Sequence, residues 1–239
     1  MYNKEQFLEN FKKLNIDITD SMWNQFVRYY ELLVEWNSFM NLTGITEFDE
    51  VLQKHFEDSL VLTKVIDVTK IESLLDVGTG AGFPGLPLKI AFPHLKVVLL
   101  DSLGKRVKFL NKVIEELGLT DITAIHGRAE DFAKKPEYRE NFDVVVSRAV
   151  ANLSSLSEYC IPYTKLNGWF IPYKSGKIDE ELSNAEKAIS ILGGKTEHVE
   201  KFVLENSDIE RTLIKIKKIK PTGKKYPRKA GLPSKEPLS

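Results

Sequence analysis

A glycine-rich turn behind an apolar strand is the part of this chain best suited to chemistry. Leu74 and Leu75 lead into Asp76, and Gly78, Gly80, Gly82 and Gly85 follow. In an open α/β sheet, such a turn lets a ligand approach the backbone at the carboxyl end of the first strand. Asp101 ends the next apolar run, 23 residues after Gly78, where an acid can accept hydrogen bonds from both ribose hydroxyls. The pattern predicts a site for a nucleotide-like cofactor.

The register of the turn distinguishes between two cofactors. Gly80, Gly82 and Gly85 match the spacing of the dinucleotide fingerprint, but that fingerprint needs its first glycine directly after the strand. Here the strand ends at Asp76, Val77 and Gly78, so a carboxylate stands at the turn itself. A carboxylate repels a pyrophosphate and favours the sulfonium and ammonium groups of S-adenosylmethionine. We expect S-adenosylmethionine, with S-adenosylhomocysteine as product; a bound dinucleotide and a turn without a ligand are the alternatives.

The composition indicates a globular enzyme and gives no sign of a metal or disulfide protein. The chain has 239 residues, 42% of them hydrophobic and 28% charged, enough for one full core and a smaller appendage. The single cysteine, Cys160, excludes an internal disulfide, and the four histidines lack metal-ligand spacing. No apolar run approaches the roughly 18 residues of a membrane span, and the start lacks the apolar core of a signal peptide. We expect a cytoplasmic protein without a metal.

The hydrophobic pattern predicts an α/β fold with a helical extension. Apolar residues recur every three or four positions through residues 1–65, with one long helix starting near Asp20 or Ser21, ending at Asn41, and a short helix over 51–64. Strand patterns follow at 73–77, 97–101, 122–126, 142–147 and 168–173, with helices at 85–92, 103–117, 153–162 and 179–192 between or after them. Residues 196–203 and 211–216 resemble a closing hairpin. This alternation predicts a doubly wound, mostly parallel sheet of seven strands.

The charge is unevenly distributed along the chain. The net charge is zero, yet residues 215–239 carry nine basic residues against one acid, and residues 1–60 carry eleven acids against five basic residues. We divide the chain into a helical cap (1–65), a cofactor-binding core (66–216) and a basic tail (217–239). A cationic tail suits a phosphate-bearing partner; a solvated, partly disordered tail, interrupted by proline and glycine, is the alternative.

Five linked motifs resemble the RsmG (GidB) family of bacterial small-subunit rRNA guanine-N7 methyltransferases. They are residues 74–91, 99–106, 127–131, 143–151 and 225–231, and the resemblance begins at residues 36–43 and 55–60, so that it covers nearly the whole chain. It implies a Rossmann-like class I S-adenosylmethionine-dependent methyltransferase fold. It also implies methylation of N7 of a single guanine, guanine 527, in 16S rRNA, by an enzyme acting as a monomer on the small ribosomal subunit.

The resemblance also implies which residues hold the cofactor. Gly78 and Phe83 line its site, Ala129 and Glu130 hold the adenine, and Arg148 closes the pocket from the fourth strand. Two of them have an ordinary structural alternative: Phe83 can pack into the core, and Glu130 can be a helix N-terminal acid favoured by the helix dipole. The Arg148 guanidinium can donate to guanine O6, to a phosphate or to the cofactor carboxylate. Asp101, the expected acceptor for the ribose hydroxyls, can instead be a surface turn residue.

The predicted reaction requires no catalytic base. Guanine N7 carries an in-plane lone pair and no proton, so attack on the sulfonium methyl needs neither proton removal nor a covalent intermediate. Cys160 falls in a predicted helix and is expected to belong to the core. Candidates for RNA contact are Arg128 and Lys174 near strand ends, and Lys224, Lys225, Arg228 and Lys229 in the tail; exposed cations without a partner are the alternative.

Two rival functions remain open at this level. The first is an S-adenosylmethionine-dependent methyltransferase acting on another RNA or a small molecule; with a small-molecule acceptor, activity should survive deletion from Pro221 onward. The second is an RNA-binding module or an NAD-dependent oxidoreductase, which cofactor-induced thermal stabilisation would distinguish. Tyr226 is an uncertain RNA contact, since it can stack on a base or pack against the sheet.

Overall fold

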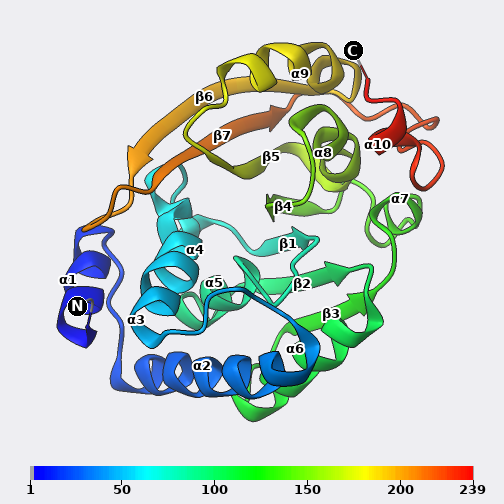
Figure 1. The fold of residues 1–239 in the computed structure, drawn as a ribbon. Helices are drawn as coiled ribbons and strands as arrows, with labels where there is room; N and C mark the ends of the chain where they lie inside the picture. The colour runs from blue at the N-terminus through cyan, green and yellow to red at the C-terminus, as the bar shows by residue number, and fades with distance from the viewer. Residues whose placement is uncertain (1–2, 239) are drawn as a thin grey trace.

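A seven-stranded sheet in the order β3-β2-β1-β4-β5-β7-β6 runs through the computed structural model, which describes residues 3–238 (Figure 1). The strands are β1 (Ser73–Val77), β2 (Lys96–Asp101), β3 (Ile122–His126), β4 (Phe142–Arg148), β5 (Thr164–Ser175), β6 (Gly194–Val203) and β7 (Glu210–Lys218). The first five pair in parallel, whereas β7 pairs antiparallel with both β5 and β6. The predicted mostly parallel sheet and its closing hairpin are confirmed.

Helices cover both faces of the sheet. The face that carries Leu74 and Leu99 packs against α5 (Gly85–Ala91) and α6 (Gly104–Glu116). The face that carries Leu75 and Leu100 packs against α7 (Ala129–Phe132), α8 (Leu153–Cys160), a 3₁₀ turn η4 (Ile161–Tyr163) and α9 (Asp179–Ile191). Alternate residues of a strand point to opposite faces, so a strand buried on both sides is apolar throughout. Cys160 ends α8 and is fully buried, as expected.

The N-terminal segment is helical, as predicted. It comprises α1 (Lys4–Lys13), α2 (Asp20–Met40), α3 (Phe48–Val51), a π-helical segment η1 (Leu52–Glu57), α4 (Asp58–Leu60), and 3₁₀ turns η2 (Val61–Lys64) and η3 (Val68–Lys70). The helix α2 begins at Asp20, as predicted, and Thr19 caps it by accepting a hydrogen bond from the amide of Met22. Asn41 ends α2 in the left-handed conformation (φ 52°). The second helical run begins at Phe48, before the predicted residue 51.

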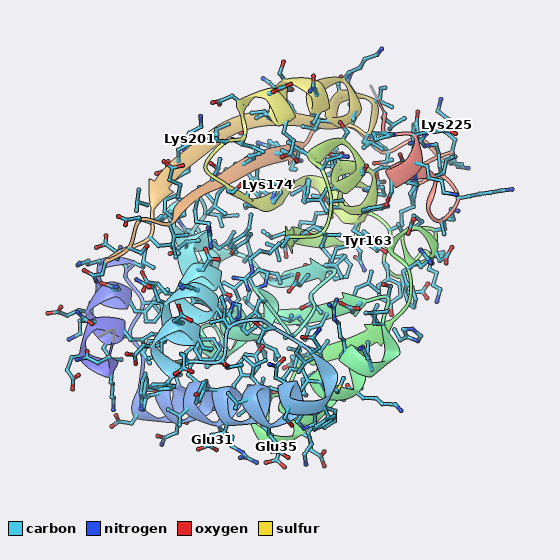
Figure 2. The ribbon with its side chains drawn as sticks, in the orientation of Figure 1. Glu31, Glu35, Tyr163, Lys174, Lys201 and Lys225 are labelled. Carbon is cyan, nitrogen blue, oxygen red and sulfur yellow. The ribbon has the colours of Figure 1, made fainter. Side chains whose placement is uncertain are left out.

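The apolar side of this segment is continuous with the core of the sheet. Phe7, Phe11 and Phe26 are fully buried in the same cluster as Leu74 and Leu99. The acids Glu31 and Glu35 point outward from α2 (Figure 2). The helices that were predicted as a cap therefore form one layer of the core and expose an acidic outer surface.

The tail is packed against the core, so the alternative of a solvated tail does not hold. The strand β7 extends to Lys218, two residues beyond the predicted end of the core, and the ammonium of Lys218 is buried against Glu140 and the carbonyl of Ile161. Beyond it, a short helix, α10 (Leu232–Lys235), lies beside α8 (Figure 1). Burial lowers the pKa of Lys218 and removes this cation from the surface.

Candidate active site

Backbone geometry at two glycines shapes the turn between β1 and α5. Gly78 has φ +71° and Gly82 has φ +103°, conformations that side-chain-bearing residues rarely adopt. A Cβ at Gly82 would lie 2.6 Å from the hydroxyl oxygen of Tyr29, which donates a hydrogen bond to the carbonyl of Ala81. Because Tyr29 belongs to α2, the N-terminal helices hold the turn in place.

Asp76 stabilises the turn from inside the protein. Its Oδ2 accepts hydrogen bonds from the hydroxyl of Thr79 (2.6 Å) and the amide of Gly85 (2.9 Å), and within residues 3–238 its Oδ1 has no partner. Burial raises the pKa of this carboxyl from 3.8 to about 6. The side chain is fully buried and lines neither of the pockets described below, so the preference for a sulfonium argued from its charge does not follow.

A pocket of about 210 Å³ opens where the strand order reverses between β1 and β4. We call it the switch-point pocket; it is lined by Val77, Gly78, Leu100, Ser102, Gly127, Arg128, Ala129, Glu130, Val150, Ala151, Tyr159 and Ser234. Ligands of open α/β sheets bind at this position. The structure thus brings together three of the predicted cofactor residues, Gly78, Ala129 and Glu130. A Cβ at Gly78 would lie 2.5 Å from Cγ2 of Val150, so the bare glycine leaves room beside the β4–α8 loop.

Asp101 lies between two lining residues of this pocket, Leu100 and Ser102, and is almost fully buried. Its Oδ1 accepts from the amide of Leu103 (2.8 Å), and its Oδ2 accepts from the amide of Gly80 (2.9 Å) and lies 3.4 Å from Arg106. These contacts exclude the alternative of a surface turn residue. Asp101 itself is not among the lining residues, and three donors already occupy its carboxylate, which can accept about four hydrogen bonds, so at most one position is left for a ribose hydroxyl.

The C-terminal tail forms one wall of the switch-point pocket. Ser234 lines it and shares a hydrogen bond with the hydroxyl of Tyr159. Glu130 is also tied to the tail, because its Oε1 accepts from the amide of Gly231 (2.8 Å). Arg228 anchors the tail through three nitrogens on the fully buried carboxylate of Glu158, at 2.7 to 3.1 Å.

Besides Asp101, two more predicted cofactor residues, Arg148 and Phe83, are not among the lining residues of the switch-point pocket. The Phe83 ring is buried and stacks on His55, with centroids 4.4 Å apart, and on Tyr29. The guanidinium carbon of Arg148 lies 5.1 Å from the centroid of that ring. Phe83 therefore packs in the core and supports Arg148 by a cation–π contact.

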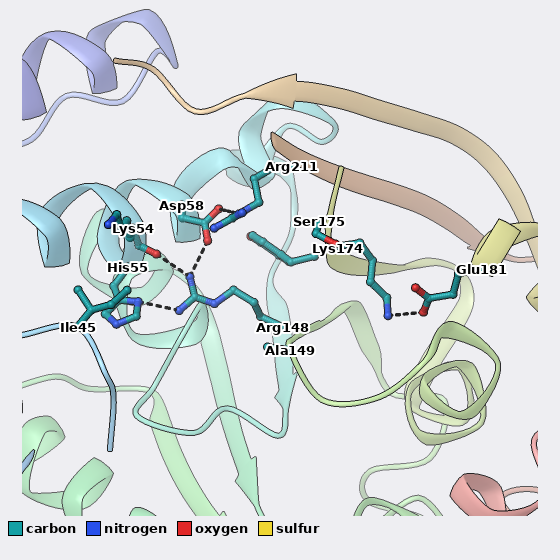
Figure 3. Close-up of a pocket in the computed structure, with 11 residues that line it drawn as sticks. Ile45, Lys54, His55, Asp58, Arg148, Ala149, Lys174, Ser175, Glu181 and Arg211 are labelled. Carbon is teal, nitrogen blue, oxygen red and sulfur yellow. Dashed lines mark hydrogen bonds and ion pairs between the residues drawn. The ribbon is translucent and has the colours of Figure 1, made fainter. Parts of the chain in front are cut away.

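Arg148 belongs to a second hollow of about 500 Å³, which we call the arginine cleft (Figure 3). Its lining residues are Ile45, Lys54, His55, Asp58, Arg148, Ala149, Tyr173, Lys174, Ser175, Glu181 and Arg211. The buried carboxylate of Asp58 accepts from Arg148 through one oxygen and from Arg211 through the other, both at 2.8 Å. Such charge-assisted bonds fix the direction of a guanidinium.

His55 is a neutral acceptor in this cleft. The guanidinium of Arg148 can only donate, so His55 Nδ1, 3.3 Å away, accepts, and Nε2–H donates to the hydroxyl of Thr43 at 2.8 Å. Burial and the charge of Arg148 lower the pKa of His55 to about 3. Asn37 holds Thr43 by accepting its amide hydrogen, so the motif at residues 36–43 supports the cleft. With both ring nitrogens engaged, His55 is not a free base.

The predicted RNA-contact residues fall into two groups. Lys224, Lys225 and Lys229 are exposed on the tail, and Figure 2 shows Lys225 at the edge of the molecule. Arg128 is exposed at the switch-point pocket. In contrast, Lys174 donates to the carbonyl of Ala151 and to Glu181, and Arg228 binds Glu158, so these two cations hold the structure together. Tyr226 is buried in the core.

Our prediction assigned no role to His55, Asp58 or Arg211. A signal existed for two of them, because residues three apart on a helical segment share a face, as His55 and Asp58 do. Arg211 stands 153 residues from Asp58, and no local pattern connects them.

Within residues 3–238 no three acidic, histidine or cysteine side chains are grouped as a metal would require, and no helix is both long and apolar enough to cross a bilayer.

Comparison with known proteins places this geometry in a family. The family model GidB, described as rRNA small subunit methyltransferase G, matches residues 22–214. Two proteins called ribosomal RNA small subunit methyltransferase G are similar over nearly all of their length. The one from Lachnoclostridium phytofermentans is 56% identical over 100% of this chain and 98% of its own, and that from Clostridium novyi is 50% identical over 95% and 93%.

A solved structure shares the fold. The O-methyltransferase from Bacillus cereus in complex with SAH has a TM-score of 0.58 and 18% identity, covering 80% of this chain and 91% of that chain. The chain therefore has the class I methyltransferase fold that its strand order indicates.

Proposed function

Because this chain belongs to the GidB family, described as rRNA small subunit methyltransferase G, we propose that it methylates N7 of a single guanine in 16S rRNA, with S-adenosylmethionine as donor. The observation that carries this is the family match across residues 22–214 together with a pocket at the reversal of strand order. The expected nucleotide is guanine 527, as the sequence resemblance implies. The acceptor is the naked rRNA or the small subunit.

The switch-point pocket suits the adenosine end of S-adenosylmethionine. Asp101, whose neighbours Leu100 and Ser102 line the pocket, would accept a ribose hydroxyl, and the backbone at Ala129 and Glu130 would face the adenine. Gly78 would let the remainder of the cofactor pass close to the backbone. The pocket of about 210 Å³ is smaller than the roughly 300 Å³ at which small-molecule pockets begin, so part of the cofactor would extend beyond it.

The residues around the two hollows position and orient the reactants, and none needs to take a proton. When bound, S-adenosylmethionine supplies an electrophilic methyl; N7 forms the new bond with its lone pair, and the sulfur–carbon bond breaks. The positive charge passes from sulfur to the guanine ring. His55 is engaged at both nitrogens, and Cys160 is fully buried. Orientation alone can contribute about 7–11 kcal/mol when it is ideal.

RNA affinity is expected to come from cations and not from base contacts alone. Lys224, Lys225 and Lys229 are exposed on the tail beside the pocket that Ser234 lines. Phosphate contacts give affinity and register, whereas base contacts specify. Guanine N7 lies in the deep major groove of A-form RNA, so the target nucleotide must be unpaired or splayed out.

The first test is methyl transfer from labelled S-adenosylmethionine to small-subunit rRNA and to small subunits. We expect label on one guanine, mapped by strand cleavage at N7-methylguanine, and a loss of at least tenfold in kcat/KM with Asp101→Ala, because one hydrogen bond to a charged group contributes about 1.5–3 kcal/mol. The exposed Asp17→Ala is the control. Cofactor binding without label on any rRNA form would refute the proposed acceptor and favour another RNA or a small molecule.

A further inference from the structure

The β4–α8 loop separates the two hollows. Ala149 lines the arginine cleft, whereas Val150 and Ala151 line the switch-point pocket. Ala149 adopts a left-handed conformation (φ 57°), which turns the chain between the two sides. Lys174 fixes the loop by donating to the carbonyl of Ala151 at 2.8 Å. The two hollows therefore lie on either side of one short loop, so ligands bound in them would be neighbours.

The cleft carries a positive surplus. Four cations line it, Lys54, Arg148, Lys174 and Arg211, against two carboxylates, Asp58 and Glu181; Lys54 is also paired with Glu50, and His55 is neutral, so one positive charge remains. Figure 3 shows the group around Arg148 on one side and the Lys174–Glu181 pair on the other. This charge suits a ligand that combines a flat base with a phosphate.

Arg148 keeps two N–H groups of its guanidinium available for a ligand. Of its five N–H groups, three donate to Asp58, His55 and the carbonyl of Lys54. The other two have no partner in the described chain. Its side chain is 15% exposed and lines the cleft, so a ligand there can accept from it.

We propose that the arginine cleft holds the target guanosine, with Arg148 donating to O6 of the base and Asp58 positioning the guanidinium. This rests on the proposed function and adds the site of the acceptor. Arginine usually binds both O6 and N7 of guanine, but here N7 must keep its lone pair for the methyl group, so O6 is the acceptor. Adenine carries an amino donor at this position and would oppose the Arg148 donor, which makes Arg148 a specificity-determining residue.

The test measures nucleotide binding by the full chain saturated with S-adenosylhomocysteine. Millimolar guanosine 5′-monophosphate should bind without displacing S-adenosylhomocysteine, and adenosine 5′-monophosphate should bind at least tenfold more weakly. Arg148→Lys keeps the charge but loses the planar donors, so it should reduce this preference to below threefold. Arg28→Lys, on the outer side of α2, is the matched control and should retain the preference.

Asp58 acts through Arg148, so its variant is judged by selectivity. Asp58→Asn should reduce the preference for guanosine 5′-monophosphate over adenosine 5′-monophosphate, even if the variant protein is less stable than wild type. A loss of protein stability alone would not change the ratio of the two affinities. If Asp58→Asn does not fold, Arg211→Lys, which alters the same carboxylate's second partner, replaces it.

Four outcomes would overturn the proposal. They are absence of guanosine 5′-monophosphate binding, equal binding of both nucleotides, displacement of S-adenosylhomocysteine, and an unchanged preference in Arg148→Lys. None depends on methyl transfer, so a protein that binds guanosine 5′-monophosphate selectively but labels no rRNA would refute the proposed function and leave the cleft assignment standing.

Discussion

At the scale of the residue, the site is built from buried charges with defined partners. Asp58 has an arginine on each oxygen, and Glu158 receives three nitrogens of Arg228. Removing one partner of such a buried pair leaves an uncompensated charge and costs about 3–5 kcal/mol. Asp76 differs, because hydroxyl and amide donors, and no cation, are bonded to its carboxylate.

Asp76 should make stability depend on pH. Its pKa is raised from 3.8 to about 6 in the folded protein, so between these values the folded state binds more protons than the unfolded one. Its contribution to stability is therefore present below pH 3.8 and is lost as the pH rises to about 6. Asp76→Asn cannot ionise, so its free energy of unfolding relative to wild type should improve by about 2 kcal/mol between pH 4 and pH 7.

Denaturant unfolding of both proteins at the two pH values measures this difference. Asp17→Asn, an exposed aspartate in the loop after α1, is the matched control for the loss of one carboxyl group. A difference between Asp76→Asn and wild type that stays constant with pH would show that folding does not raise the pKa of Asp76.

At the scale of the element, the tail acts as a strap over α8 and the switch-point pocket. Ser234 lines the pocket, the amide of Gly231 holds Glu130, and Arg139 donates to the carbonyls of Thr222 and Tyr226. Deletion from Pro221 would thus remove a pocket wall as well as the lysines that we propose to bind RNA. That deletion cannot distinguish an RNA acceptor from a small molecule, contrary to our expectation from sequence.

Release of the strap should weaken cofactor binding. Arg228→Met leaves the buried Glu158 without its cation, so the tail should detach in a large fraction of molecules. If the strap is closed in only a tenth of them, the dissociation constant of S-adenosylhomocysteine rises roughly tenfold. Calorimetric titration measures it, with Lys235→Met, an exposed cation of the same tail, as control. Equal affinity in the two variants would mean that the strap does not shape the pocket.

At the scale of the whole molecule, charge of opposite sign lies on different surfaces. Glu31 and Glu35 lie on the outer side of α2, where Arg28 pairs with Glu31, and Lys225 of the tail lies at a distant edge of the molecule (Figure 2). The protein is neutral overall, so its attraction to RNA comes from this arrangement and not from net charge.

The three exposed tail lysines should account for part of the salt dependence of RNA binding. Replacing Lys224, Lys225 and Lys229 by glutamine should reduce the slope of log affinity against log salt by about 2, since each phosphate contact to single-stranded RNA contributes about 0.7. Filter binding across a salt series measures the slope. The control replaces Lys70, Lys96 and Lys195, exposed lysines at or before the amino ends of β1, β2 and β6. An unchanged slope in the tail variant would place the RNA elsewhere.

The sequence by itself determined the fold, the register of the glycine turn and the family, because these depend on local patterns: apolar runs of strand length, glycines at fixed spacing and motifs in order. It also predicted that Gly78, Ala129 and Glu130 belong together, since the carboxyl ends of parallel strands meet at one edge.

Only the tertiary structure decided which side chains share a hollow. It separated Arg148 and Phe83 from the switch-point pocket, joined Asp58 to Arg211 across 153 residues, and bonded the tail to Glu130 and Glu158. The physical reason is that a buried charge binds whichever partner the packing of distant elements brings within hydrogen-bond reach, and neither periodicity nor spacing along the chain records that distance.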